Sequence, residues 1–341
     1  MPIQGLVSLL LMSNNLEHLI QAKVSLAPMA GITDYVLRSI IRKHSKSALI
    51  TTEMISSEYL AQTLNGRSGT EIFKRDENHS PISYQVSGHK PILMHKAAEF
   101  LNDYADMIDI NMGCPVKKVV GGQDGAALMR TPELAQDLVR AVKDGTDKPV
   151  SVKFRLGYTA DEMNFVEFGE KMQEAGADFI TLHARTRAQM YSGKADWAKI
   201  KELKQNVDIP VFANGDILTV DDAVKCIELS NADGVAVGRG ALSDPTLIGR
   251  IEHYFRTGEK LPEAGLSEKI EILKYHLDEE IKLRGKNVGI KFMRKFYPYY
   301  LSGFENAKIL HSKLVVEDSY DKIAELLAEN AGQAERSVPA V

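Results

Sequence analysis

From residue 107 to residue 115 the chain reads MIDINMGCP, an apolar run of strand length that ends in a turn carrying a thiol. Gly113 permits unusual backbone dihedrals and Pro115 fixes its own φ, so the two residues restrain the chain on either side of Cys114. A glycine-rich stretch at 121–125 follows, and the connection 112–130 is predicted to be a long flexible loop, a kind that is usually functional or disordered. Position alone leaves two interpretations of Cys114 open: a small residue in a turn, or a reactive group.

The same order, an apolar run and then an amphipathic helical segment, occurs eight times along the chain. The runs predicted to be strands are residues 24–28, 48–52, 82–86, 107–111, 150–154, 179–183, 211–214 and 234–237. The helices predicted to follow them lie near residues 33–43, 56–64, 91–104, 131 onward, 161–175, 197–206, 219–230 and 244–255. Nearly continuous apolar strands are typical of parallel sheets buried on both faces. Eight strand–helix units in series therefore predict an α/β fold, a (β/α)8 TIM barrel.

A doubly wound sheet is the competing architecture, and it would require a glycine fingerprint after its first strand. The chain has Ala27-Pro28-Met29-Ala30-Gly31 at that place, which does not fit. A length of 341 residues leaves room for a second unit beside a barrel. We predict an N-terminal extension at 1–22, a barrel domain at 23–256 and a small all-helical C-terminal domain at 257–341.

Bulk composition argues against several classes of protein. The 44% hydrophobic and 26% charged residues are ordinary for a globular chain, and a net charge of −4 gives no overall basic field. Two widely separated cysteines, Cys114 and Cys226, form neither a disulfide framework nor a metal-ligand spacing. No apolar run approaches the roughly 18 residues of a membrane span, and the short run at 6–12 lacks the flanks of a signal peptide. We expect a cytoplasmic monomer without a metal ion, and a loosely attached N-terminal extension.

Chemistry in parallel barrels lies on the loops that follow the carboxyl ends of the strands. Nearly every predicted strand end carries an amide, a thiol or a charge, a pattern that core packing alone does not produce. These residues are Pro28-Met29, Gln85, Asn111 with Cys114, Lys153 with Arg155, His183 with Arg185 and Arg187, Asn214-Gly215-Asp216, and Gly238-Arg239-Gly240. A phosphate commonly binds after strands seven and eight, where glycines allow close approach and a guanidinium supplies charge. The last two groups therefore predict a phosphate-bearing cofactor.

Together these segments resemble the tRNA-dihydrouridine synthase family of flavoenzymes, and in particular its bacterial branch. The resemblance is carried by residues 26–31, 85–88, 109–115, 152–157, 183–187, 214–216, 238–240 and, in the C-terminal third, 289–295. Ala184 is a departure, because the family often has glycine there. The resemblance implies an FMN-bound barrel that reduces uridine in tRNA to 5,6-dihydrouridine, with NADPH as the electron donor.

The resemblance also implies a role for each strand-end residue. Reduced flavin would deliver hydride to C6 of uracil, and Cys114 would donate the proton that C5 needs, because a thiol with an ordinary pKa of about 8.5 is mostly protonated at neutral pH. Lys153 would lie beside the flavin N1/C2 edge, where negative charge accumulates on reduction. The other implied cofactor contacts are Pro28 and Met29 on the ring, Gln85 and Asn111 at its polar edge, His183 at the flavin or the uracil carbonyl, and Asn214, Gly215, Gly238 and Arg239 at the phosphate, with Asp216 beside them. The implied substrate contacts in the barrel are Arg155, Arg185 and Arg187.

Residues 282–313 form a local basic stripe, with eight lysines and arginines against Glu305 alone. Such a stripe in an acidic protein indicates a phosphate-rich partner, here tRNA, with Lys291, Arg294 and Lys295 as candidate contacts. We interpret the aromatic residues interleaved with the stripe mostly as the core of the helical domain. A target uridine must also leave its stack to reach a flavin, and the loop 112–130 is a candidate lid over it.

Two other functions stay open. An FMN barrel that acts on a free pyrimidine, similar to a dihydroorotate dehydrogenase, would not need the basic helical tail. An RNA-binding protein without catalysis would not need Cys114, Lys153 and His183 together.

Overall fold

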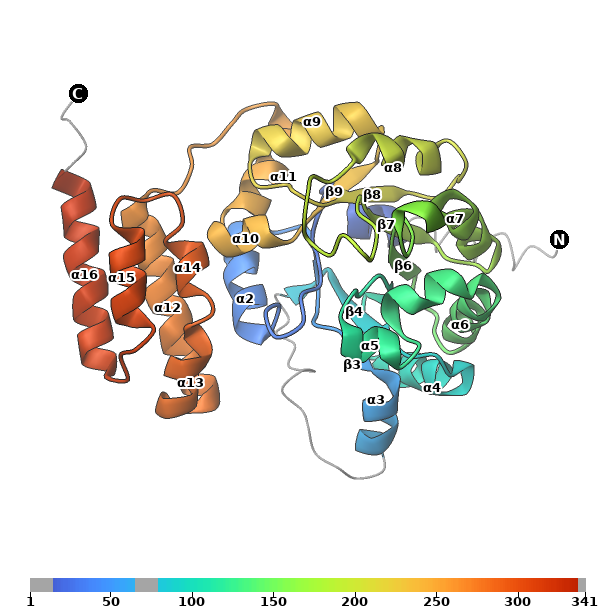
Figure 1. Ribbon diagram of the computed structural model, residues 1–341, viewed down its shortest axis with the longest axis horizontal. Coiled ribbons are helices and arrows are strands. Elements are labelled where there is room, and N and C mark those ends of the chain that lie inside the picture. Colours follow the sequence, from blue (N-terminus) through green and yellow to red (C-terminus); the bar gives the residue numbers. More distant parts are fainter. Residues whose placement is uncertain (1–14, 65–78, 337–341) are drawn as a thin grey trace.

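A closed barrel of parallel strands forms the centre of the computed structural model, which describes residues 15–64 and 79–336 (Figure 1). In these residues the strands are β1 Val24–Leu26, β2 Leu49–Thr51, β3 Ile55–Ser56, β4 Ile82–Ser87, β5 Met107–Met112, β6 Val150–Arg155, β7 Phe179–His183, β8 Val211–Asn214 and β9 Gly234–Val237. β9 pairs with β1 and β2 pairs with β4, so eight strands close the circle, while β3 adds two residues beside β4. The predicted (β/α)8 barrel is confirmed.

Helices lie around the outside of the barrel, between successive strands (Figure 1). In the described residues they are α2 Tyr35–His44, α3 Ser57–Leu64, α4 Pro91–Leu101, α6 Pro132–Asp144, α7 Phe165–Glu174, α8 Trp197–Lys204, α9 Val220–Ser230, α10 Arg239–Ser243 and α11 Leu247–Thr257. Asp34 caps α2 by accepting from the Leu37 N–H, and Thr219 and Asp222 form a capping box on α9. The helix predicted at 161–175 begins only at Phe165, because Ala160–Glu162 forms a separate 3₁₀ turn.

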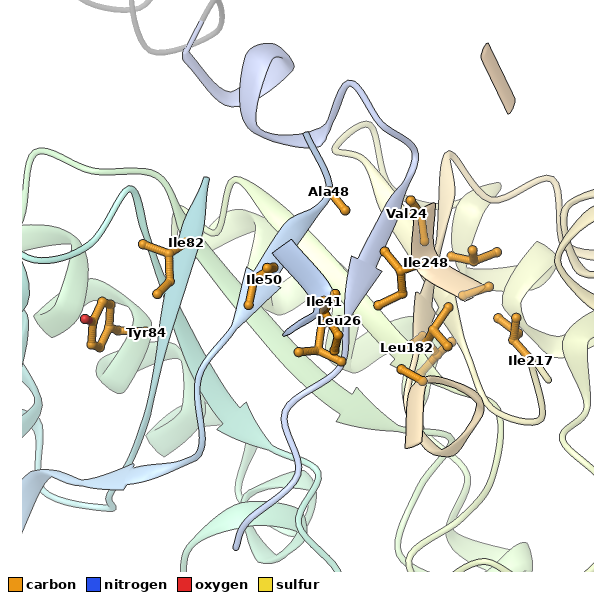
Figure 2. Packing of buried hydrophobic residues seen from close by; sticks show 14 of the residues in the cluster. Val24, Leu26, Ile41, Ala48, Ile50, Ile82, Tyr84, Leu182, Ile217 and Ile248 are labelled. Atoms are coloured by element: carbon orange, nitrogen blue, oxygen red, sulfur yellow. The ribbon is translucent and has the colours of Figure 1, made fainter. Parts of the chain in front are cut away.

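Buried aliphatic side chains connect the strands to the helices that cover them. Figure 2 shows Leu26 of β1 and Ile50 of β2 with Ile41 of α2, and all three are fully buried. Because parallel strands are covered on both faces, their sequences read as continuous apolar runs.

The pairing register brings the polar residues at the strand ends level with one another. Asn111 pairs with Lys153, Arg155 with His183, and His183 with Asn214. Side chains from β5, β6, β7 and β8 therefore meet at the carboxyl end of the barrel.

The connection after β5 differs from the sequence-based expectation. It contains the helix α5, Lys117–Gly121, and the 3₁₀ helix η3, Gly125–Arg130. Gly125 has a φ of +61°, and a Cβ at this position would lie 2.8 Å from the carbonyl oxygen of Cys114. The same oxygen accepts from the Ala126 N–H at 3.1 Å. The segment predicted to be a long flexible loop therefore contains two short helices, which make their own hydrogen bonds and pack against the Cys114 turn.

The N-terminal extension is also more ordered than expected where the structure describes it. Residues 15–20 are helical, and Leu19 is only 3% exposed. Leu19 packs against Leu49, Met107, Phe179 and Phe212, which lie at or near the starts of four strands. These residues close the end of the barrel opposite the polar strand ends, so the extension is not loosely attached there. The apolar run at 6–12 lies outside the described residues.

The C-terminal helices stand together beside the barrel, next to α2 and α10 (Figure 1). They are α12 Leu266–Arg284, α13 Lys286–Met293, α14 Tyr297–Tyr300, α15 Ala307–Leu314 and α16 Tyr320–Arg336. Phe296, Tyr297 and Tyr300 are fully buried and belong to the same hydrophobic cluster as the barrel core. The predicted helical C-terminal unit is confirmed, but it shares its core with the barrel. None of the described helices is long and apolar enough to cross a membrane.

Candidate active site

A cavity of about 420 Å³ opens at the carboxyl end of the barrel, within the size range of small-molecule sites. It is lined by Cys114 and by every residue that the family resemblance assigned to the cofactor. Those residues are Pro28, Met29, Gln85, Asn111, Lys153, His183, Asn214, Gly215, Asp216, Gly238 and Arg239. Arg155 also lines the cavity, whereas Arg185, Arg187, Lys291, Arg294 and Lys295 do not.

A chain of hydrogen bonds fixes the turn that carries Cys114. The buried carboxylate of Asp109 accepts from Gln85 Nε2 at 2.7 Å, and Gln85 Oε1 accepts from Asn111 Nδ2 at 2.8 Å. Asn111 Oδ1 in turn accepts the backbone N–H groups of Gly113, at 3.2 Å, and Cys114, at 2.9 Å. Each amide nitrogen has a second N–H group, so Gln85 and Asn111 both hold the turn and keep a donor for a ligand.

Asp109 is a residue of this chain of bonds that sequence reasoning did not single out. It is 4% exposed on β5, also accepts from Ser151 Oγ at 2.6 Å, and its burial raises the pKa of its carboxyl group. The available signal was a charged residue inside an otherwise apolar strand, because a buried carboxylate needs hydrogen-bond partners.

Lys153 provides a cation in the wall of the cavity. Its Nζ donates to Asn214 Oδ1 at 3.0 Å, and Asn214 Nδ2 donates to the carbonyl of Ala236 at 2.7 Å, which fixes the orientation of the amide. Burial and the neighbouring Arg155 lower the pKa of Lys153 to about 8. The ammonium form still dominates at neutral pH.

His183 is a neutral imidazole beside this cation. It is 6% exposed, and burial together with the charges of Arg155 and Lys153 holds its pKa well below the ordinary value. A neutral ring has one nitrogen that donates and one that accepts. His183 can therefore bind a carbonyl or an N–H group of a ligand without adding charge.

The arginines near the site bond mainly to the protein itself. Arg155 donates to the backbone carbonyls of Gly113, at 2.8 Å, Thr186, at 3.0 Å, and Met190, at 2.8 Å, so it joins the loops after β5 and β7. Arg185 is 1% exposed and donates to Ser192, Gly193 and Asp216.

Asp216, which lines the cavity, joins Arg185 to a further arginine, Arg239. It accepts from Arg185 at 2.5 Å and from Arg239 at 3.0 Å. Burial alone would raise the pKa of Asp216, but the bonds from Arg185 and the Ala195 N–H lower it below the ordinary value. Asp216 therefore keeps Arg239 beside Gly238 and Gly240, where the cavity reaches the start of α10. Gly240 has no room for a side chain, since a Cβ would lie 2.3 Å from the Ile217 carbonyl oxygen.

Tyr191, Tyr299 and Met54 also line the cavity, and sequence reasoning missed all three in this role. The ring of Tyr191 has its centroid 6.4 Å from that of His183, and the guanidinium carbons of Arg155 and Arg239 lie 5.6 and 5.2 Å from it. The position of Tyr191 in the loop after β7 was the sequence feature that could have indicated this role. Tyr299 comes from the helical domain, which no strand-end argument reaches.

Comparison with known proteins identifies this arrangement. The family described as dihydrouridine synthase matches residues 25–334. The chain belongs to the dihydrouridine synthase family. The protein is 38% identical to the probable tRNA-dihydrouridine synthase 1 of Synechocystis sp., over 90% of this chain and 86% of that one. It is 35% identical to a probable tRNA-dihydrouridine synthase of Rickettsia conorii, over 84% and 87%, and 37% identical to tRNA-dihydrouridine synthase B of Pseudomonas aeruginosa, over 84% and 86%.

The dihydrouridine synthase match covers the C-terminal helices as well as the barrel, and the resemblance drawn from the strand-end motifs is confirmed.

The basic residues of the stripe 282–313 divide into two groups. Lys282, Lys286, Lys291, Lys308 and Lys313 are exposed. Arg294 instead donates to Asp318 at 2.8 Å, and Lys295 donates to the backbone carbonyl of Gly31 in the barrel.

Proposed function

We propose that this protein reduces specific uridines of tRNA to 5,6-dihydrouridine, with FMN as the bound cofactor and NADPH as the electron donor. The observation that carries the proposal is the meeting of Cys114, Lys153 and His183 in one cavity of a dihydrouridine synthase chain. A cytoplasmic location follows from a tRNA substrate.

The residues present fit a flavin mononucleotide. Gln85 and Asn111 each keep an N–H donor for a polar ring edge, and Lys153 supplies a positive charge for an anionic one. Gly238, Gly240 and Arg239 meet where a phosphate binds in barrels of this kind. Met29, whose Sδ would lie 3.7 Å from a Cβ at Gly238, borders the same space with an apolar surface. When bound, a reduced flavin supplies the hydride for the uracil ring.

The chain itself supplies the proton. Cys114 holds it on Sγ, at a turn fixed by the side chain of Asn111 on one side and by Gly125 on the other. A positioned proton donor contributes typically 10²- to 10⁴-fold to such a step. His183, as a neutral ring, orients a uracil carbonyl or N–H without competing for that proton.

The helical domain supplies the surface for tRNA. Exposed lysines neutralise phosphates and release counterions, which accounts for most of the affinity of such surfaces. The exposed cations of the basic stripe are Lys282, which pairs with Glu279, and Lys286, Lys291, Lys308 and Lys313. Arg294 and Lys295 instead bond to other groups of the protein. A free pyrimidine substrate would give this surface no purpose.

One experiment separates the proposed function from its alternatives. The purified protein is incubated with FMN, NADPH and unmodified tRNA transcripts, and dihydrouridine is measured by mass spectrometry, beside a parallel reaction with free uracil and orotate, the unsaturated pyrimidines that NADPH could reduce. We expect product in tRNA alone. Turnover of the free pyrimidine only would favour the dihydroorotate-type enzyme, and tRNA binding without product would favour the non-catalytic RNA-binding protein.

A further inference from the structure

We propose that Lys295 is a positioning residue for the active site, which holds a loop of the cavity in place from the helical domain and does not contact RNA. The inference rests on the flavin site proposed above. Because Lys295 lies in the basic stripe, its sequence context predicted that it contacts tRNA. The structure gives it a different role.

The loop in question is residues 28–31, between β1 and α2. Pro28, Met29 and Ala30 line the cavity, and Gly31 follows them with a φ of +72°. The Gly31 N–H donates to Glu53 Oε1 at 2.5 Å, and the Gly31 carbonyl accepts from Lys295 Nζ. Both polar groups of one residue are thus bonded, one to a barrel side chain and the other to the helical domain.

The surroundings of Lys295 suit this contact and disfavour a bond to RNA. Its Nζ lies 3.3 Å from the centroid of the Phe292 ring, and the Arg284 guanidinium lies 3.9 Å from the same centroid. Burial lowers the pKa of Lys295, while the charges of Asp34 and Glu53 oppose that change. Lys291, four residues earlier, is exposed to solvent.

A second bond holds the chain three residues beyond Gly31, where the loop enters α2. Arg284 of α12 donates to Asp34 Oδ2 at 2.8 Å and to Glu280 Oε2 at 2.5 Å, and Asp34 is the cap of α2. His276, Asp34 and Glu280 lie close enough to ligate a metal ion, but Arg284 bonds to both carboxylates. We therefore interpret the group as an ion-paired junction between the barrel and the helical domain.

The helical domain also reaches the cavity directly. Tyr299 lines it, and α14, which carries Tyr299, packs against α10 at the end with Arg239. Lys295 lies two residues before the start of α14. Loss of the Lys295 bond therefore frees the loop 28–31 at a place where the helical domain forms part of the cavity.

The test compares two neighbouring lysines of the full-length protein, Lys295→Met and Lys291→Met. FMN is removed, and its dissociation constant is measured by the quenching of flavin fluorescence; tRNA affinity is measured separately over a range of salt concentrations. We expect Lys295→Met to raise the FMN dissociation constant about tenfold and to shift the visible flavin absorption, with tRNA affinity changed less than twofold. Lys291→Met should leave the FMN dissociation constant and the flavin absorption unchanged and should weaken tRNA binding.

Lys295→Arg retains a donor for the Gly31 carbonyl and should restore most of the FMN affinity. Lys295→Gln removes the same charge but keeps a polar side chain, and it replaces the methionine variant should that variant not fold. Lys295 variants that bind FMN as the wild type does but lose tRNA affinity would overturn this inference and leave the proposed function intact. A wild-type protein that binds no FMN would overturn both.

Discussion

Cys114 is held in place by its backbone, so its side chain remains available for chemistry. Its N–H is bonded to Asn111 and its carbonyl to the Ala126 N–H, and both bonds survive the loss of the thiol. The other cysteine, Cys226, is buried on α9, and burial raises the pKa of its thiol to about 12. The two thiols therefore differ in a way that can be tested.

We expect Cys114→Ala to bind FMN and to allow its reduction by NADPH at the wild-type rate, because neither step uses the thiol. Dihydrouridine formation should fall by roughly 10²-fold or more, the usual contribution of a positioned acid. Stopped-flow absorbance measures flavin reduction, and mass spectrometry of tRNA measures product. Cys226→Ala is the matched control and should retain product formation; full yield from Cys114→Ala would remove Cys114 as the acid.

Lys153 makes the cofactor site sensitive to pH. Its pKa of about 8 lies below the ordinary value of 10.5, so the ammonium is present below pH 8 and is lost as the pH rises through that value. We expect FMN affinity, measured by fluorescence titration from pH 7 to pH 9.5, to weaken above pH 8. Lys153→Arg should bind with a flat profile, because arginine keeps its charge in this range. A wild-type affinity independent of pH would show that the cation does not assist binding.

Among the elements, the N-terminal helical turn and the segment after β5 have roles that their sequences did not reveal. Residues 15–20 close one end of the barrel through Leu19, and α5 with η3 packs on the Cys114 turn at the other end. The sequence shows the apolar content of the first segment and the glycines of the second. It does not show which part of the chain each segment packs against. Leu19 contacts four residues that follow it by 30 to nearly 200 positions.

Leu19→Ala should lower the free energy of unfolding by about 2–4 kcal/mol, because a leucine truncated in a packed site loses transfer free energy and leaves a cavity. Thermal unfolding followed by circular dichroism would show a drop in Tm of several degrees. Leu229→Ala, on a leucine that is 45% exposed on α9, is the control and should have a small effect. Equal Tm values for the two variants would contradict the described packing of the N-terminal turn.

For the molecule as a whole, the barrel and the helical domain act as one body. They share a hydrophobic core, and Arg284, Lys295 and Tyr299 link the helices to the loop and cavity of the barrel. The helical domain therefore has two groups of cations, one exposed to solvent and one bonded at the junction with the barrel. In the function proposed above, the exposed group binds RNA and the inner group maintains the junction.

Replacing Lys286, Lys291 and Lys308 together by glutamine should weaken tRNA binding and reduce the slope of log affinity against log salt by about two to three, roughly one per phosphate contact. FMN affinity should not change. Filter binding at several salt concentrations gives the slope. A control with the exposed lysines Lys96, Lys201 and Lys225 of α4, α8 and α9 changed to glutamine carries the same loss of charge on the barrel. The proposed RNA surface would be contradicted by equal slopes for the two triple variants.

Much of this protein can be read from its sequence because the relevant signals are local. Apolar runs and amphipathic segments alternate eight times, and the closed barrel follows from that repetition because only burial on both faces suits such strands. The same repetition places Asn111, Lys153, His183 and Asn214 at strand ends, where the register makes them neighbours. The candidate cavity could therefore be predicted before any coordinate was known.

The partners of the cations could not be predicted in this way. Arg155 and Arg185 follow neighbouring strands and look alike in the sequence, yet Arg155 borders the cavity and Arg185 is enclosed by Asp216 and two carbonyls of its own loop. Lys291 and Lys295 are four residues apart in one basic stripe, yet one faces solvent and the other bonds to Gly31, 264 positions earlier. Hydrophobic periodicity is a property of nearby residues, whereas the partner of a charge is whatever the folded chain brings beside it. Only the folded structure therefore decides which of these residues are available to bind a ligand and which hold other parts of the protein in place.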